Sequence, residues 1–375
     1  MTEAPAGAAP FEDIRRLIAM MPGPDEAAVT AVRERNAALL KPAGSLGRLE
    51  WLVEWLAAWQ RKAPPAVERP LVCVFAANHG VAARGVSAYP PDASRAMLEN
   101  FTSGRAAIYQ ICASMGLGFK VFDLAIEMPT NDIVDAPAMD EKACVATMAF
   151  GMEAIAGGAD LLALGEFGLG NTTIAAAIYA ALYGGPAGRW IEPEAGTDDG
   201  RVERKIAVVE AALARHREHL HDPLEILRRL GGRDIAAMAG AILAARLQRI
   251  PVVLDGYVAG AAAAILHALN PAALDHCIAG HLAAEAAHRE VLERLGKIPL
   301  LALGVRLGEG TGAALAAGLV RTAAACHAGM GSQVTGAAGA ADQASPVTPL
   351  PDRGAAGSAE HRPPEARPSR ATQGR

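Results

Sequence analysis

From residue 70 onward, short apolar runs alternate with helix-length, alanine-rich segments, and this alternation constrains the fold more than any other feature of the chain. Each run is followed by a turn. The runs are Leu71–Ala76, Phe119–Leu124, Asp160–Leu164, Pro251–Leu254 and Pro299–Leu303. Repeated alternation of strand and helix is typical of a mainly parallel sheet with helices on both faces. We therefore predict a doubly wound α/β core.

The segments on either side of this core have different patterns. Apolar residues recur with helical spacing near residues 9–20, near 24–40 and over 46–62, and turn sequences separate these segments. They predict a small helical lobe over residues 1–65, ahead of an α/β core over 66–330. Residues 331–375 are rich in alanine, glycine and proline and contain no aromatic residue, so we expect a disordered tail.

The composition excludes several classes of protein. The 35 Lys and Arg against 40 Asp and Glu give a net charge of −5 without a dense basic cluster, so no nucleic-acid partner is expected. The five cysteines are scattered and form no CxxC pair, which indicates neither a disulfide framework nor a zinc site. Acidic residues precede any apolar stretch at the N-terminus, and glycine and proline interrupt the longest uncharged stretches. We expect a cytoplasmic protein without a membrane partner.

Ligands of open parallel sheets bind beyond the carboxyl ends of the strands, so the residues after each run are the most informative. The turn Gly168–Thr173 follows the third run and opens a helix over 174–183. It offers backbone N–H groups, two hydroxyls and the positive end of a helix dipole, which together suit a phosphate. The alternative is an Asn/Thr cap behind a tight glycine turn. The turn lacks the Gly-Lys-Ser/Thr ending of an NTPase phosphate loop.

The segment Gly308–Ala313 follows the fifth run and places Glu309 among glycines. Its spacing fits a dinucleotide fingerprint, but no further strand with an acidic residue follows it, so we reject that interpretation. A lone carboxylate beyond a strand can serve as a proton acceptor. The alternative is a first-turn Glu that interacts favourably with the helix dipole.

Other charged residues have two interpretations each. Residues 184–233 break the alternation and are expected to form an excursion over the active site, within which the charged residues 201–219 predict an exposed helix. Lys205 on this helix is either solvated or a phosphate ligand. His281, Glu285 and His288 would share one helical face, and with His79 they suggest a metal site. Because no further ligand lies nearby, we expect caps or surface groups, and no metal.

Several segments together resemble the nicotinate-nucleotide:dimethylbenzimidazole phosphoribosyltransferase family, which acts in assembly of the lower ligand of cobalamin. The similarity covers about residues 10–328, and the shared order of the segments makes it more specific than any single motif. The segments are Lys41–Glu50 (KPAGSLGRLE), Asn78–Val81 (NHGV), Gly85–Pro90 (GVSAYP), Gly165–Thr173 (GEFGLGNTT), Pro251–Gly256 (PVVLDG), His281–His288 (HLAAEAAH) and Leu303–Leu315 (LGVRLGEGTGAAL).

The resemblance implies transfer of the phosphoribosyl group of nicotinate mononucleotide to 5,6-dimethylbenzimidazole by a homodimer, without a cofactor. The products are α-ribazole 5′-phosphate and nicotinate. Nicotinate leaves as a neutral pyridine nitrogen, so one base suffices, which takes the benzimidazole N–H proton. By motif, Glu309 is that base, Glu166 begins the loop that holds the nucleotide, and Ser87 and Tyr89 lie beside the base pocket. The remaining substrate-binding residues implied by the resemblance are Gly168, Gly170, Asn171, Thr172, Thr173, Lys205 and Arg306.

Three positions depart from the family pattern. Asn78 stands where the family usually has Asp, which removes a charge near the base pocket. Residues 191–197 replace a Gly-x-Gly-Thr-Gly loop, and Ala96 replaces a glutamine. Two alternatives stay open: a non-catalytic homologue that binds a nucleotide or base as a sensor, and an unrelated α/β enzyme with a phosphate-bearing ligand, such as a dehydrogenase. The presence of Glu309 argues against the sensor.

Overall fold

A five-stranded parallel sheet forms the centre of the computed structural model, which describes residues 10–90, 92–191 and 199–332. The strand order is β2-β1-β3-β4-β5, so the chain adds β2 on one side of β1 and the later strands on the other. This arrangement confirms the predicted doubly wound α/β fold. The strands are β1 Pro70–Ala76, β2 Gly118–Asp123, β3 Leu161–Phe167, β4 Val252–Leu254 and β5 Cys277–Ala279.

Thirteen α-helices occur among the described residues, together with four short 3₁₀ helices. The α-helices are α1 Pro10–Ala19, α2 Glu26–Ala38, α3 Arg48–Gln60, α4 Ala93–Thr102, α5 Ala107–Met115, α6 Glu141–Ala154, α7 Asn171–Tyr183, α8 Asp199–His216, α9 Pro223–Leu230, α10 Arg233–Gln248, α11 Tyr257–Leu269, α12 Ala286–Arg294 and α13 Thr311–Gly329. The 3₁₀ helices are η1 Gly80–Arg84, η2 Ala187–Arg189, η3 Arg217–His219 and η4 Pro271–Leu274.

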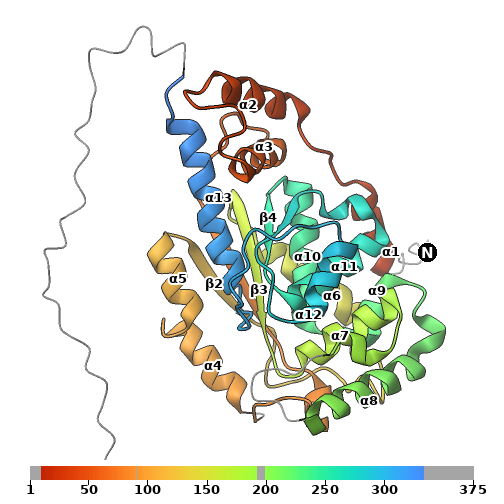
Figure 1. Ribbon diagram of the computed structural model, residues 1–375. Helices are drawn as coiled ribbons and strands as arrows, with labels where there is room; N and C mark the ends of the chain where they lie inside the picture. The colour runs from red at the N-terminus through yellow and green to blue at the C-terminus, as the bar shows by residue number, and fades with distance from the viewer. Residues whose placement is uncertain (1–9, 91, 192–198, 333–375) are drawn as a thin grey trace, which may run out of the picture. The chain divides into compact units, whose positions relative to one another are not determined.

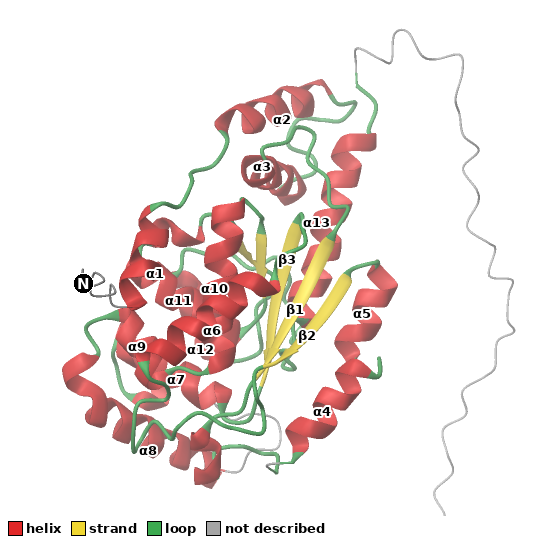
Figure 2. Cartoon of the chain, turned by 180° about the vertical axis from the view of Figure 1, so that it is seen from behind, coloured by secondary structure: helices red, strands yellow, loops and turns green. Residues whose placement is uncertain are grey.

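Helices cover both faces of the sheet (Figures 1 and 2). Because side chains alternate along a strand, Cys73 and Phe75 of β1 enter one apolar core while Val72 and Val74 enter the other. The first core includes buried residues of α6, α7, α10 and α11, and the second includes those of α3, α5 and α13. Both layers are largely aliphatic and alanine-rich, which suits a chain with 4% aromatic residues.

The three helices expected before residue 65 are confirmed. The Asp25 side chain caps α2 by accepting a hydrogen bond from the Ala28 N–H at 2.9 Å. These helices divide between the two cores: α1 packs with α6 and α10, whereas α2 and α3 pack with each other, and α3 packs with α13. The described residues up to Ser332 belong to one compact unit, and a boundary at residue 65 stays a prediction. The predicted tail lies outside the described residues, apart from Gly331 and Ser332.

The predicted fifth strand, Pro299–Leu303, is wrong. Only Leu301 forms a bridge there, with His281, and Leu303 is exposed. The regular strand is Cys277–Ala279, which His276 and Gly280 flank, whereas the equally short β4 lies within the longer apolar run of residues 250–254. The later segment pairs with the chain just beyond β5, since the Leu300 and Leu301 N–H groups donate to the carbonyl oxygens of Ala279 and Gly280.

The predicted third strand is also longer than expected. β3 continues past Leu164 to Phe167, so Glu166 lies in the strand and not in the loop after it. Gly165, within this extension, permits close approach of another segment, because a Cβ atom there would lie 2.1 Å from the backbone nitrogen of Gly310. The segment that contains Glu309 therefore lies directly against β3. Among the described residues, no helix is both long and apolar enough to cross a membrane.

Candidate active site

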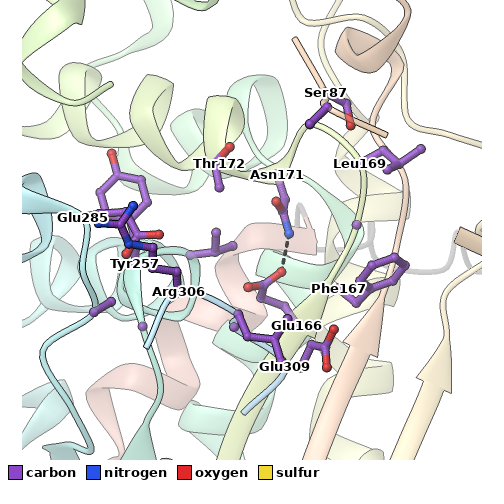
Figure 3. Close-up of a pocket in the computed structure, with 18 of the residues that line it drawn as sticks. Ser87, Glu166, Phe167, Leu169, Asn171, Thr172, Tyr257, Glu285, Arg306 and Glu309 are labelled. Atoms are coloured by element: carbon purple, nitrogen blue, oxygen red, sulfur yellow. Dashed lines mark hydrogen bonds between the residues drawn. The ribbon is translucent and has the colours of Figure 1, made fainter. Parts of the chain in front are cut away.

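A cavity of about 310 Å³ opens beyond the carboxyl ends of β3, β4 and β5 (Figure 3). Its walls come from residues 166–172, 256–258, 281–287 and 305–309, with further residues from 86–97, 190–191 and α8. Ten of the predicted site residues line it. They are Ser87, Tyr89, Glu166, Gly168, Gly170, Asn171, Thr172, Lys205, Arg306 and Glu309. Thr173 does not line the cavity; its side chain is buried and its hydroxyl has no partner among the described residues.

The start of α7 forms one end of the cavity. The helix begins at Asn171, three residues earlier than the sequence indicates, and Gly170 before it has a φ of 86° that favours glycine. The Lys205 Nζ atom donates to the Thr172 hydroxyl oxygen at 3.1 Å. Lys205 is 3% exposed, so the interpretation of a solvated lysine is wrong. An ammonium group, a hydroxyl and a helix N-terminus together favour a bound anion.

The helix that carries Lys205, α8, is amphipathic, whereas the sequence predicted an exposed helix there. Val208, Val209 and Ala212 on the same helix are buried in the core, while Glu203 and Arg204 are exposed. The buried face of α8 packs on α7. This packing holds the lysine over the first turn of α7, from a position far along the chain.

Glu309 lines the same cavity as the start of α7, on a turn with a left-handed backbone conformation. Gly308, Glu309 and Gly310 have φ angles of 70°, 62° and 77°, a conformation that residues other than glycine seldom adopt. The Glu309 N–H donates to the carbonyl oxygen of Glu166 at 3.2 Å. Glu309 precedes the cap of α13, Gly310, and is 3% exposed, so the alternative of a first-turn Glu is wrong.

Burial, and then the charge of Asp255, raise the pKa of Glu309 to about 7. A carboxyl group with such a pKa can exchange a proton near neutral pH, which is what a general base requires. Glu166 lies beside it in Figure 3, where its side chain accepts a hydrogen bond from the Asn171 amide. Burial, and then the charges of Asp234 and Asp255, raise the pKa of Glu166 well above its ordinary range.

Other residues of the cavity wall were not predicted as site residues. Phe167 and Leu169 lie within the Gly165–Thr173 motif, and alternation around its glycines could have indicated them. Trp190 and Tyr257 carry no such signal, because they come from segments far apart in the sequence. They pack together around Tyr179, whose hydroxyl donates to the Tyr257 carbonyl oxygen at 2.5 Å.

Asn78 has a structural role that its position in the motif did not reveal. Its side chain is buried and is not part of the cavity wall, so it changes no charge inside the cavity itself. Its Nδ2 donates to the Ile126 carbonyl oxygen at 3.0 Å, and its Oδ1 accepts from the Ser94 hydroxyl at 2.7 Å and the Leu169 N–H at 3.1 Å. Asn78 thus joins its own segment to the loops of Ile126 and Leu169 and to α4. Of the other departures, Ala96 does not line the cavity, and residues 192–197 lie outside the described residues.

The four suggested metal ligands do not form one cluster, although the ring centres of His281 and His288 lie 6.4 Å apart. His281 lies in the loop after β5, Glu285 is the residue before α12, and only His288 is on the helix, so the single helical face is wrong. His288 accepts a hydrogen bond from the Ala283 N–H at 3.0 Å, and His79 lies 3.3 Å from Asp234 in the buried core. The part of the chain that the structure describes holds no group of three or more His, Cys, Asp or Glu side chains that could bind a metal ion.

Comparison with known proteins identifies the family. A family model described as "Phosphoribosyltransferase" matches residues 21–337. A nicotinate-nucleotide–dimethylbenzimidazole phosphoribosyltransferase from Rhizobium rhizogenes is 63% identical over 321 residues, which is 86% of this chain and 95% of that protein. The chain belongs to the nicotinate-nucleotide–dimethylbenzimidazole phosphoribosyltransferase family.

Further relatives of this family agree in sequence and in fold. One from Methylocella silvestris is 62% identical over 338 residues, covering 89% of this chain and 99% of that protein. The crystal structure of CobT from Thermus thermophilus has a TM-score of 0.76 at 39% identity, covering 82% of this chain and 97% of that one. Membership of the family favours neither the sensor nor the unrelated dehydrogenase.

One motif that carries the family resemblance lies away from the cavity. Within Lys41–Glu50, the Lys41 Nζ atom donates to Glu50 Oε1 at 2.8 Å, and the Leu46 N–H donates to the same oxygen at 3.1 Å. The Lys41 ammonium group is the main reason that the pKa of Glu50 is lowered. This motif therefore fixes the turn before α3 and contributes no side chain to the cavity.

Proposed function

We propose that this protein transfers the 5-phosphoribosyl group of nicotinate mononucleotide to 5,6-dimethylbenzimidazole. In this reaction a benzimidazole nitrogen forms a bond to C1′ of the ribose while the bond from C1′ to the nicotinate nitrogen breaks. The electron pair of the broken bond returns to nicotinate, which leaves as a neutral pyridine nitrogen. The N–H proton of the attacking ring passes to Glu309, so the products are α-ribazole 5′-phosphate and nicotinate.

The observation that carries this proposal is the presence of Glu309 and the Lys205–Thr172 pair in one cavity. The reaction needs a proton acceptor at the attacking ring and an anion site for the phosphate. Glu309 has a pKa raised to about 7 by burial and by Asp255, which matches a general base at neutral pH. Lys205 and Thr172 line the same cavity at the start of α7, where a phosphate is favoured.

The shape and charge of the cavity also suit these substrates. Its volume of about 310 Å³ is in the range of small-molecule sites. Phe167 and Leu169 provide apolar surface for a planar base, in a cavity that Ser87 and the exposed Tyr89 also line. The carboxylate of Glu309 suits the positive pyridinium ring, and exposed Arg306 offers a cation to an anionic group of the nucleotide.

We further propose a homodimer in the cytoplasm. Exposed Trp51 and Ile298 lie in one neighbourhood, because the Arg48 guanidinium lies 5.9 Å from the Trp51 ring and donates to the Ile298 carbonyl oxygen at 3.0 Å. Exposed apolar side chains that lie together favour association of protein surfaces. Light scattering after size-exclusion chromatography should give twice the mass of the chain, and a monomer at micromolar concentration would contradict the dimer.

One assay distinguishes the proposed reaction from its alternatives. Purified protein is incubated with nicotinate mononucleotide, with and without 5,6-dimethylbenzimidazole, and nicotinate and α-ribazole 5′-phosphate are measured by mass spectrometry. Release of nicotinate only when the base is present supports transfer. Binding of the nucleotide, measured by calorimetry, without release of nicotinate would indicate a sensor. The absence of both binding and release would exclude this substrate.

A further inference from the structure

We propose that Asp255 is a positioning residue that holds the Glu309 turn in place by accepting hydrogen bonds from two amides at the start of α13. The proposal deepens the proposed function and rests on it, because it concerns the residue that takes the proton. Asp255 follows directly after β4, and its own side chain is not part of the cavity wall. It therefore acts through Glu309 and does not touch the substrate.

Both carboxylate oxygens of Asp255 bind the backbone around the turn. Oδ2 accepts a hydrogen bond from the Gly310 N–H at 3.2 Å, and Oδ1 accepts one from the Ala313 N–H at 2.8 Å. The first amides of an α-helix have no acceptor within the helix, so a side chain usually caps them. The residue at the cap position of α13 is Gly310, which has no side chain. Asp255 supplies the missing cap from a neighbouring strand.

Glycine is required at position 310 for two reasons. Its φ angle is 77°, which other residues rarely adopt. A Cβ atom there would also lie 3.2 Å from the Val72 Cγ1 atom and 3.5 Å from the Gly165 Cα atom, so the backbone passes closely over the sheet. Because the close approach to the sheet requires glycine at position 310, this residue has no side chain that could cap α13. The acceptor then has to come from another element, and Asp255 is at hydrogen-bond distance.

The two peptide groups that flank Glu309 are held by two different strands. The Glu309 N–H donates to the Glu166 carbonyl oxygen of β3 at 3.2 Å, and the following N–H, that of Gly310, donates to Asp255 after β4. A residue other than glycine keeps a left-handed conformation only where its surroundings hold it there. The hydrogen bonds that Asp255 and Glu166 accept provide that restraint and set the direction of the Glu309 side chain.

The charge of Asp255 acts on the same residue. It is the charge that adds to burial in raising the pKa of Glu309. Asp255 itself faces His281, whose Nε2 lies 3.5 Å from Oδ1, and it also raises the pKa of Glu166. Position and basicity of Glu309 therefore both depend on Asp255.

A double-mutant cycle tests the proposal with wild type, Asp255→Asn, Glu309→Gln and the double variant. The asparagine keeps the shape but has only one acceptor oxygen, so one of the two amides loses its partner. At pH 8, Asp255→Asn should lower kcat roughly 10–100-fold, as expected for a displaced catalytic group, with the KM for nicotinate mononucleotide little changed. In the Glu309→Gln background the same substitution should have no further effect, because no base remains to be positioned.

Asp234→Asn is the matched control, since Asp234 is also buried beside a histidine but its side chain accepts from the Ile235 N–H and not from the turn. Its effect on kcat, whatever its size, should be the same with Glu or Gln at position 309. Equal losses from Asp255→Asn in both backgrounds, an unchanged kcat, or a variant that does not fold would each overturn the proposal. So would near-normal turnover by Glu309→Gln.

A wild-type protein that transfers nothing would contradict the proposed function and not the role of Asp255. Hydrogen exchange measured by mass spectrometry then decides. Peptides covering residues 308–314 should exchange faster in Asp255→Asn than in wild type, while peptides over the start of α7 should not change. Unchanged exchange at 308–314 would overturn the proposal.

Discussion

The ammonium group of Lys205 donates a hydrogen bond to the hydroxyl of Thr172 at 3.1 Å, although the two residues lie 33 positions apart. Thr172 belongs to the first turn of α7, and Lys205 reaches it from the buried face of α8. A cation is thereby placed beside amides that already favour an anion. We therefore expect Lys205 and Thr172 to bind the phosphate of the nucleotide and not the base.

Lys205→Met should raise the KM for nicotinate mononucleotide much more than the KM for the base, because only the nucleotide carries a phosphate. The loss of one charge-assisted hydrogen bond costs about 1.5–3 kcal/mol, or roughly 10–150-fold in affinity. Steady-state kinetics with each substrate varied in turn measure both constants. Lys142→Met, at an exposed position of α6, is the matched control and should change neither. Equal increases in both constants would contradict a phosphate role for Lys205.

Thr172→Val and Thr173→Val should differ, although the two residues are neighbours in the motif. Thr172 lines the cavity, so its valine variant should bind the nucleotide more weakly in calorimetry. The Thr173 hydroxyl is buried without a partner among the described residues, so replacing it with a methyl group should leave binding unchanged and stability equal or slightly higher. Weaker binding by Thr173→Val would show that its hydroxyl reaches the phosphate when the nucleotide is bound.

Gly165→Ala, a substitution in β3, should displace the Glu309 turn. The added Cβ atom would lie 2.1 Å from the Gly310 nitrogen, so the Glu309 turn has to move away from β3. Overpacking of this kind costs about 1–3 kcal/mol of stability, and turnover should fall because the base is displaced. Gly329→Ala, where nothing lies within 4 Å of the new atom, is the control. Normal turnover by Gly165→Ala would contradict the requirement for close approach.

The fold class and ten of the cavity residues could be predicted from the sequence, for different reasons. Apolar runs that alternate with helical segments indicate buried parallel strands, whereas β5 is a run of three residues between His276 and Gly280 and gives almost no pattern. Glu309 and the Gly168–Thr172 turn could be predicted because glycines around a polar residue indicate an unusual backbone. Residues such as Trp190, Tyr257 and Asp255 could not be assigned roles, because long-range packing alone brings them together.

The roles of Lys205 and Asn78 also depend on long-range packing that the sequence does not show. A lysine in a charged helix is usually solvated, and only the packing of α8 on α7 reveals that this one is buried. For Asn78, the sequence motif suggests a change of charge near the base. Its three hydrogen bonds show instead that its amide joins loops, and a carboxylate could not donate to the Ile126 carbonyl oxygen.

The pH dependence of turnover should follow the ionisation of Glu309. Burial and Asp255 raise its pKa to about 7, and only the ionised form accepts a proton, so kcat/KM for the nucleotide should fall as the pH drops below about 7. The positive pyridinium ring favours the ionised form, so the corresponding fall in kcat should occur at lower pH. A profile of kcat/KM that stays flat between pH 5 and 8 would exclude Glu309 as the base.

The same pKa shift predicts how stability changes with pH. Between the ordinary value of 4.5 and about 7, folded Glu309 keeps its proton while the unfolded chain releases it, so its contribution to the free energy of unfolding falls as pH rises through this window. Glu309→Gln removes this effect. The variant should gain stability relative to wild type between pH 5 and 8, on the order of a few kcal/mol, in denaturant unfolding. An equal difference at both pH values would contradict the raised pKa.

The most direct measurement is the turnover of Glu309→Gln in the nicotinate-release assay at pH 8, with nucleotide and base both saturating. Glutamine keeps the size of the side chain but cannot accept the proton, so turnover should fall roughly 10²–10⁴-fold. Calorimetry should show that both substrates still bind, and the melting temperature should not be lower than that of wild type. Near-normal turnover by the folded variant would contradict the assignment of Glu309 as the general base.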